Sequence, residues 1–238
     1  MTKSIATVSF LAAVLAGLFA LPSCEQRRED DRSPVQGDQG DPEYVVAVVL
    51  DVSGSYLERI KGKNPLAYKF FLRLATNYAA DRAASADRIL IAQISRKEPA
   101  ILWEGWPKRL RSDFSGPDSF RDFVLARSDA NGSLVYAGIA ATIERVLEYP
   151  GVQAGRTRSA IFVLSDMEDN DPDGPAQKAR LLEGLRRYAK VRHGCVGFYW
   201  VQQQRLVAEW TGHLTDAGVR RFNVSPDYDA DPAVPTFD

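Results

Sequence analysis

Short apolar runs and longer amphipathic segments alternate along most of this chain. The short runs are rich in Val, Ile and Ala, which is typical of buried strands. In the longer segments apolar residues recur every three or four positions, which predicts helices with one buried face. The predicted strands are 44–50, 88–95, 100–103, 159–165, 195–201 and 219–224.

Local signals place the helices between these strands. Asn64 followed by Pro65 predicts a helix start, and Asp118 or Ser119 is expected to cap a short helix. The remaining predicted helices are 134–147, 176–191 and 203–217, the last ended by Gly218. Strands that alternate with helices predict an α/β fold, with a mainly parallel central sheet flanked by helices on both faces in a Rossmann-like three-layer sandwich. The segment 104–117 gives no clear pattern and is expected to be a variable insertion.

The N-terminus has the features of a secretory signal. Lys3 precedes an apolar stretch over 5–21, and Leu21-Pro22-Ser23-Cys24 follows. This ending resembles a bacterial lipoprotein signal, which implies removal of residues 1–23 and lipidation of Cys24. An ordinary signal peptide and an uncleaved anchor are the alternatives, and all three place the folded domain outside the cytoplasm, in the periplasm or at the cell surface.

The segments that flank the predicted domain are polar. Residues 25–42 contain Val35 as the single sizeable apolar side chain, so 24–42 is interpreted as a lipidated Cys followed by a flexible tether. A flexible coil of this length has ends about 20–25 Å apart. The stretch 225–238 contains several Pro and Asp and is interpreted as an acidic, Pro-rich tail.

Composition excludes some classes of function. The chain is 45% apolar with a net charge of −1, so it supports a substantial core and does not predict a nucleic-acid surface. It contains two Cys. If Cys24 is lipidated, Cys195 stands alone in an apolar strand, where it is expected to be a small buried hydrophobe. A Cys24–Cys195 disulfide requires that Cys24 is unmodified.

Hard oxygen ligands gather where two predicted strands end. Asp51, Ser53 and Ser55 follow the first strand, with Gly54 between the two serines. Asp166 follows the strand 159–165. Ligands of open α/β sheets bind outside the carboxyl ends of the strands, and Mg²⁺ and Ca²⁺ prefer such oxygen ligands. Turn and cap chemistry at the strand ends is the alternative interpretation.

These motifs resemble the metal-ion-dependent adhesion site of von Willebrand factor type A (vWA) domains. The first loop matches the Asp-x-Ser-x-Ser motif, and Ser133 after Gly132 stands where the family has a Thr. Asp166 matches the Asp of the third loop, and the resemblance covers roughly 43–224. It implies that Asp51, Ser53, Ser55, Ser133 and Asp166 hold Mg²⁺, or Mn²⁺ or Ca²⁺, and that this cation engages an Asp or Glu carboxylate of a protein partner.

A second metal site is a weaker hypothesis. The segment 169–174 reads Asp-Asn-Asp-Pro-Asp-Gly, as in the first half of a calcium loop. The twelfth position of that loop would be Arg180 instead of Glu. An acidic, solvated loop is the preferred interpretation.

The sequence favours a binding module over an enzyme. Aspartate-based phosphatases use Asp-x-Asp, whereas Ser53 stands at the second position here. His193 and His213 are expected away from the serines, which disfavours a Ser-His-Asp hydrolase. The main hypothesis is thus a non-enzymatic, membrane-tethered vWA-like module. A metal-dependent, phosphatase-like hydrolase on the same site and a structural module with a vestigial metal site remain the alternatives.

Overall fold

The structure is a computed structural model of the whole chain, and it describes residues 41–52, 69–71, 73–74, 87–95, 99–127, 132–226 and 232. The chain divides into the units Met1–Gly37 and Asp38–Asp238. Every described residue belongs to the second unit, which is an α/β fold.

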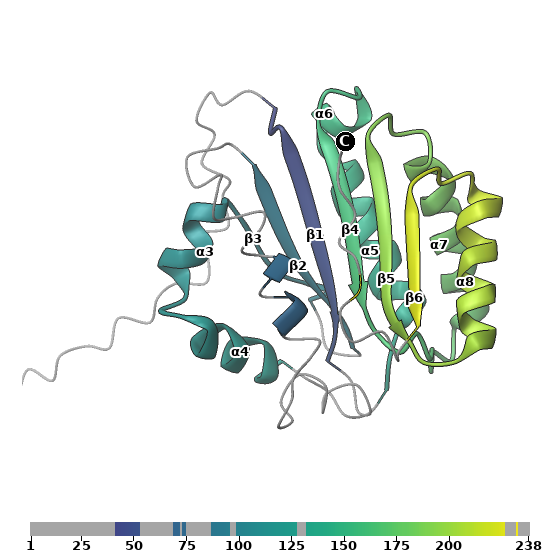
Figure 1. The fold of residues 1–238 in the computed structure, drawn as a ribbon, viewed down its shortest axis with the longest axis horizontal. Coiled ribbons are helices and arrows are strands. Elements are labelled where there is room, and N and C mark those ends of the chain that lie inside the picture. Colours follow the sequence, from purple (N-terminus) through teal and green to yellow (C-terminus); the bar gives the residue numbers. More distant parts are fainter. Residues whose placement is uncertain are drawn as a thin grey trace, which may run out of the picture. The chain divides into compact units, whose positions relative to one another are not determined.

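The described residues form a six-stranded sheet with the order β3-β2-β1-β4-β5-β6 (Figure 1). Neighbouring strands are parallel except for β2 and β3, which are antiparallel. The strand bounds are β1 Tyr44–Asp51, β2 Arg88–Ile94, β3 Ile101–Gly105, β4 Arg158–Leu164, β5 Gly194–Val201 and β6 Phe222–Pro226. The predicted mainly parallel sheet is therefore confirmed.

The central strands are apolar on both faces because helices cover both. All eight residues of β1 are buried, and β4 is buried at six of its seven positions. Side chains of a strand alternate between faces. Val45, Ala47 and Val49 accordingly belong to one core, and Val46 and Val48 belong to the other.

Helices α5 (Val135–Leu147), α7 (Gly174–Tyr188) and α8 (Gln204–Ala217) cover one face of the sheet. Their apolar stripes supply Ile139, Leu185 and Trp210 to the first core. Gly138 permits the close approach of α5 to β2, because a Cβ there would stand 2.9 Å from the backbone oxygen of Gln93.

The opposite face packs against helical residues 69–71 and 73–74, α3 (Pro107–Asp113) and α4 (Pro117–Leu125). Phe70, Phe71 and Leu74 are buried there, together with Phe120 of α4. The rings of Phe71 and Phe120 stack with their centroids 4.8 Å apart. The sequence predicts a helix after Asn64, and Phe70 and Leu74 are helical. The predicted start of this helix at Asn64 lies outside the described residues.

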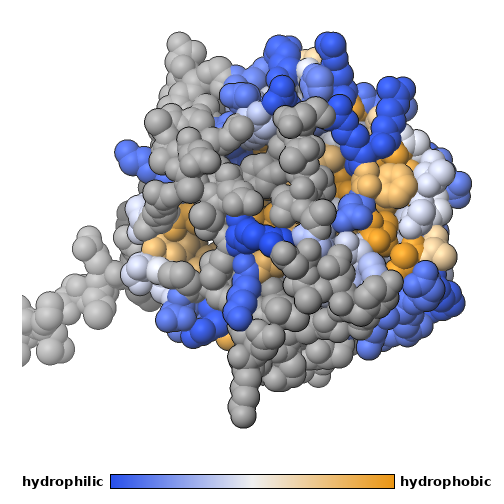
Figure 2. Space-filling model, viewed as in Figure 1, coloured by the Kyte–Doolittle hydropathy of each residue, from blue (hydrophilic) through white to orange (hydrophobic). Residues whose placement is uncertain are grey.

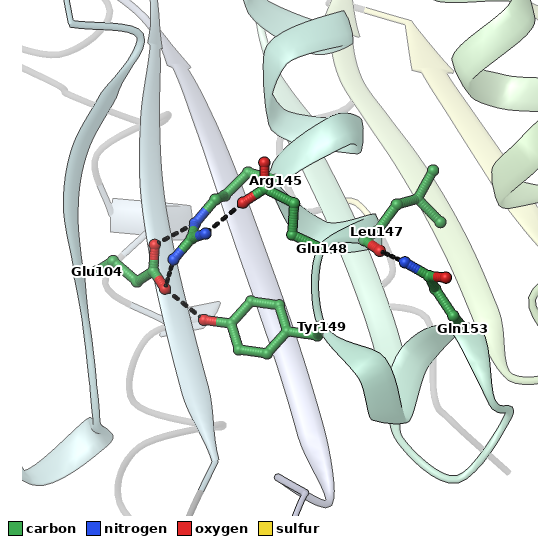
Figure 3. Close-up of polar contacts among 6 residues, drawn as sticks. All are labelled: Glu104, Arg145, Leu147, Glu148, Tyr149 and Gln153. Carbon is green, nitrogen blue, oxygen red and sulfur yellow. Dashed lines mark hydrogen bonds and ion pairs between the residues drawn. The ribbon is translucent and has the colours of Figure 1, made fainter. Parts of the chain in front are cut away.

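A polar cluster ties the edge strand β3 to α5 (Figure 3). Arg145 of α5 donates two hydrogen bonds of 2.7 Å to the carboxylate of Glu104 on β3. Tyr149 donates its hydroxyl hydrogen to the same carboxylate. Because Glu104 is partly buried, this charge-assisted pairing fixes an edge strand that has a single strand neighbour.

Several boundaries differ from the sequence prediction. The strand predicted at 219–224 begins at Phe222, so Ser225 and Pro226, predicted as the start of the tail, belong to β6. Proline is tolerated there because β6 is an edge strand. The segment 104–117, predicted as an insertion, contains α3, and the short helix α6 (Pro150–Gln153) was not predicted.

The cap of α4 also differs from the prediction. The helix begins after Gly116, and Pro117 occupies its first turn. Ser119 lies one turn inside, where its hydroxyl accepts a hydrogen bond from Gly116 N. The cap of α8 is as predicted, because Gly218 ends the helix in the left-handed conformation with φ of 81°.

The predicted signal segment and Cys24 lie outside the described residues. In the ranges that are described, no helix is long and apolar enough to cross a membrane. Asp41 and Pro42, the last two residues of the predicted tether, contact the folded unit. Arg156 pairs with Asp41, and the Thr157 hydroxyl donates a 2.6 Å hydrogen bond to the carbonyl of Pro42.

Candidate functional site

The candidate site lies at the carboxyl ends of β1 and β4. The chain runs from β1 to β2 on one side of β1, and it returns to β4 on the other side. Such a reversal of strand order opens a crevice outside the strand ends, which is where open α/β sheets bind ligands. Asp51 ends β1, and Ser165 and Asp166 directly follow β4.

The carboxylate of Asp51 is fully buried and is held by Ser165. The Ser165 hydroxyl donates a 2.7 Å hydrogen bond to Asp51 Oδ2. The same hydroxyl oxygen accepts a 2.9 Å hydrogen bond from Met167 N. Ser165 therefore orients the buried carboxylate and is itself fixed by the turn that follows it.

Ser133 approaches the same carboxylate from a loop that is distant in sequence. Its hydroxyl oxygen lies 3.5 Å from Asp51 Oδ1 and 3.4 Å from Asp51 Oδ2, and its side chain is buried. Gly132 precedes it with φ of 134°, a backbone conformation that favours glycine. The Ser133 carbonyl accepts a 2.9 Å hydrogen bond from Asn170 N, which joins this loop to the loop after β4.

Asp166 is buried in the loop after β4. Its Oδ1 accepts a 3.0 Å hydrogen bond from Glu168 N, and its carbonyl accepts one of 3.2 Å from Gln202 N at the end of β5. The next residue, Met167, has φ of 65° and is also buried. A non-glycine residue in this conformation carries strain, and such strain concentrates at functional sites.

The acidic segment 169–174 is a hydrogen-bonded loop that leads into α7. The carboxylate of Asp169 accepts hydrogen bonds of 3.3 Å from Tyr136 N and Asp171 N. Asp171 Oδ1 accepts one of 2.8 Å from Asp173 N. Burial raises the pKa of Asp169 above its usual value, although the backbone N–H groups oppose the shift. The choice between an acidic loop and a second calcium site stays a prediction.

The residues present fit a hard cation. Asp51, Ser133 and Asp166 offer oxygen atoms only, and such donors suit Mg²⁺, Mn²⁺ and Ca²⁺. Two oxygens bound at right angles to one cation stand about 3.0 Å apart for Mg²⁺ and about 3.4 Å apart for Ca²⁺. The 3.4–3.5 Å separations between Ser133 and Asp51 are close to the Ca²⁺ value, exceed the Mg²⁺ value, and are longer than a strong O–H···O hydrogen bond.

Two of the five predicted ligands, Ser53 and Ser55, lie outside the described residues. Within the described part of the chain, no three His, Cys, Asp or Glu side chains are grouped so that they could hold a metal ion. The predicted set differs from such a group because its five members are two carboxylates and three hydroxyls.

The sequence analysis missed the role of Ser165. Ser165 was assigned to the strand before Asp166, although its hydroxyl donates a 2.7 Å hydrogen bond to Asp51. Strand register contains the signal: Leu50 pairs with Leu164, so Asp51 and Ser165 continue the two strands side by side. A hydroxyl one residue before the third-loop Asp is therefore adjacent to the first-loop Asp.

The other residues singled out from the sequence lie away from these strand ends. Cys195 is a free, buried cysteine near the start of β5, as predicted, and burial raises the pKa of its thiol to about 12. His193 immediately precedes β5, and His213 lies on α8, where its imidazole contacts Trp210 and Glu209.

No protein-family model matches this chain, and no curated protein is significantly similar to it. Among solved structures, it is similar to proximal thread matrix protein 1 from the mussel byssus in crystal form 2, with a TM-score of 0.47 and 11% identity over 79% of this chain and 44% of that chain. A second structure of the same mussel protein has a TM-score of 0.42 and 12% identity over 78% of this chain and 43% of that chain. This chain therefore spans less than half the length of those structures.

Proposed function

We propose that this chain is a vWA-like binding module, tethered to a membrane outside the cytoplasm, that engages a carboxylate of a protein partner through a divalent cation. The convergence of Ser133 and Ser165 on the buried carboxylate of Asp51 carries the proposal. These residues lie on segments far apart in the sequence, yet they meet at the reversal of strand order.

Asp51, Ser53, Ser55, Ser133 and Asp166 would hold the cation. When bound, the cation supplies a positive centre that accepts a carboxylate oxygen from outside the chain. The vWA resemblance implies that the hydroxyls contact the cation directly and that the two Asp act through water. Few negative charges then bind the cation directly, which favours an acidic partner. Ser165 acts on this site by holding Asp51 in place, and Met167 N holds Ser165.

The membrane tether rests on the sequence before Asp41. If the lipoprotein interpretation is right, the mature chain begins with a lipidated Cys24, and mass spectrometry of the purified protein detects this. A free, unmodified N-terminus elsewhere in residues 20–30 contradicts the lipoprotein route without bearing on the cation site.

Capture of partners from membrane extracts tests the binding function. Wild-type protein is compared in the presence of Mg²⁺ and in the presence of a chelator, with Asp166→Ala as the matched variant. The proposal predicts partners that are retained by the wild type with Mg²⁺ and lost both with chelator and with Asp166→Ala. A partner set that is identical in all three arms contradicts it.

A further inference from the structure

Acidic side chains are concentrated at the carboxyl edge of the sheet, and basic side chains predominate at the amino edge, where exposed Glu43 and Asp216 also lie. At the carboxyl edge, the loop after β4 contributes acidic residues close to the candidate cation site. At the amino edge, where the parallel strands begin, basic residues gather in the turns before β5 and β6. The acidic residues are Asp166, Glu168, Asp169, Asp171 and Asp173, and the basic residues are Lys190, Arg192, Arg220 and Arg221.

The basic residues lie in two turns that precede the neighbouring strands β5 and β6. Arg192 lies beside the turn before β4, where an ideal Cβ on Gly155 would stand 3.2 Å from Arg192 Cβ. Arg221 accepts a 3.0 Å hydrogen bond at its carbonyl from Val196 N of β5. Figure 2 has the same view as Figure 1 and shows hydrophilic side chains over the upper end of the sheet, where these strands begin.

These cations face solvent. Lys190, Arg192 and Arg220 are exposed, and they form no ion pair with any residue in the described ranges. Their charge is therefore available to an external anion. We call the surface formed by Lys190, Arg192, Arg220 and Arg221 the basic edge.

The chain enters the folded unit beside the basic edge. Asp41 pairs with Arg156, and the Thr157 hydroxyl holds the carbonyl of Pro42, so the segment before β1 is fixed against the turn before β4. Arg192 packs near the same turn. Any anchor that precedes residue 41 is therefore joined to the domain at the amino edge of the sheet, where the exposed cations lie.

We propose that the basic edge docks on an anionic phospholipid surface and so directs the cation site away from the membrane. The inference rests on the membrane tether of the proposed function, because a tether of about 20–25 Å keeps the basic edge close to the bilayer. Basic side chains near an anionic leaflet are attracted over about one Debye length. The acidic carboxyl edge is repelled by the same surface, so both edges favour one orientation.

Energy transfer in reconstituted vesicles tests the orientation. The full chain is inserted into vesicles of phosphatidylcholine with phosphatidylglycerol that contain an acceptor dye on the lipid headgroups. A donor dye is attached to a cysteine introduced by Ala154→Cys near the amino edge or by Gln204→Cys at the start of α8, both at exposed positions. Buried Cys195 is shielded from the dye. If the chain without an introduced cysteine takes up dye, Cys24 is unmodified. The Ala154→Cys and Gln204→Cys variants are then both measured with Cys24→Ser added.

The proposal predicts greater energy transfer from position 154 than from position 204 in anionic vesicles. The difference disappears in phosphatidylcholine alone and at about 1 M salt, where the Debye length falls to about 3 Å. The variant with Lys190→Gln, Arg192→Gln and Arg220→Gln shifts the docking equilibrium toward the free orientation by about fivefold for each charge removed.

A charge-matched variant with Arg121→Gln, Arg127→Gln and Arg205→Gln, which lie away from the basic edge, keeps the difference. Equal transfer from the two positions, or greater transfer from position 204, overturns the proposal. An orientation that persists in the basic-edge variant also overturns it, because the docking then depends on other residues. None of these results depends on cation binding, so the docking proposal can fail while the cation site holds, and the cation site can fail while the docking proposal holds.

Discussion

The hydroxyl of Ser165 donates a 2.7 Å hydrogen bond to Oδ2 of Asp51, so the ends of the two central strands are joined through buried polar groups. Asp51 is fully buried, and a buried carboxylate requires hydrogen-bond donors or a cation nearby. Ser165 therefore holds Asp51, a predicted ligand of the candidate site, in position.

Ser165→Ala is expected to weaken Mg²⁺ binding about tenfold, because Asp51 loses the donor that orients it. Ser159→Ala is the matched control: Ser159 is also fully buried on β4, but its hydroxyl bonds the Tyr188 hydroxyl at the opposite end of the strand. Both variants are expected to lose about 1–2 kcal/mol of unfolding free energy. Calorimetric titration and urea unfolding check the pair, and an equal effect of both on Mg²⁺ affinity contradicts the role of Ser165.

Substitutions at Ser133 test the second loop. Ser133→Ala is expected to weaken Mg²⁺ binding less than Asp51→Ala does, because water can replace one neutral ligand. Ser133→Thr is expected to retain or strengthen binding, since a branched side chain holds its hydroxyl more rigidly. The dissociation constant for Mg²⁺ is measured for each variant. Binding by Ser133→Ala that equals that of the wild type removes Ser133 from the ligand set.

Protonation of Asp169 is expected to make folding stability depend on pH. Burial raises its folded pKa above the usual value of 3.8, so folding favours the protonated form. The contribution of Asp169 to the unfolding free energy therefore falls as pH rises from about 3.8 through the raised pKa. Asp169→Asn keeps an oxygen for Tyr136 N and has no charge to bury.

The unfolding free energy of Asp169→Asn, measured relative to that of the wild type, should therefore increase as pH rises through this window. Asp173→Asn is the control, because Asp173 is exposed on the same loop. Urea unfolding at a series of pH values provides the comparison. A difference between Asp169→Asn and wild type that stays constant with pH, or that changes in the opposite direction, contradicts the assignment.

Two glycines of α8 are expected to respond oppositely to the same substitution. Gly212 lies inside the helix with open space around an added Cβ, so Gly212→Ala should stabilise the protein by about 1 kcal/mol. Gly218 ends the helix with φ of 81°, so Gly218→Ala should destabilise it by about 1 kcal/mol. Thermal or urea unfolding measures both, and changes of the same sign contradict the described end of α8.

The fold was predictable where burial dictates residue type along whole elements. The run 44–50 is almost wholly aliphatic because β1 is covered on both faces, and 134–147 repeats its apolar residues with helical spacing because α5 packs on one side. The edge elements were less predictable. The strand β6 has three half-buried positions at its start, so its sequence carries a weaker signal than β1 does.

Short elements were missed because local sequence does not determine them. Helix α3 has seven residues, with several polar side chains, and it forms where Leu110 packs against the second core. At the candidate site, motif position singled out Asp51, Ser133 and Asp166, and the structure brings Ser133 to Asp51. The role of Ser165 depends on the register between β1 and β4, which a single sequence does not specify.

The shared use of one cation by Asp51 and Asp166 is the most direct test of the proposed function. Calorimetry on residues 38–238 measures Mg²⁺ binding by the wild type, Asp51→Ala, Asp166→Ala and the double variant. The proposal predicts one Mg²⁺ per wild-type chain, strong loss in each single variant, and a double variant that is little worse than either, since ligands of one site act as a unit. Binding by Asp51→Ala and Asp166→Ala that equals that of the wild type would contradict the cation site and the function proposed from it.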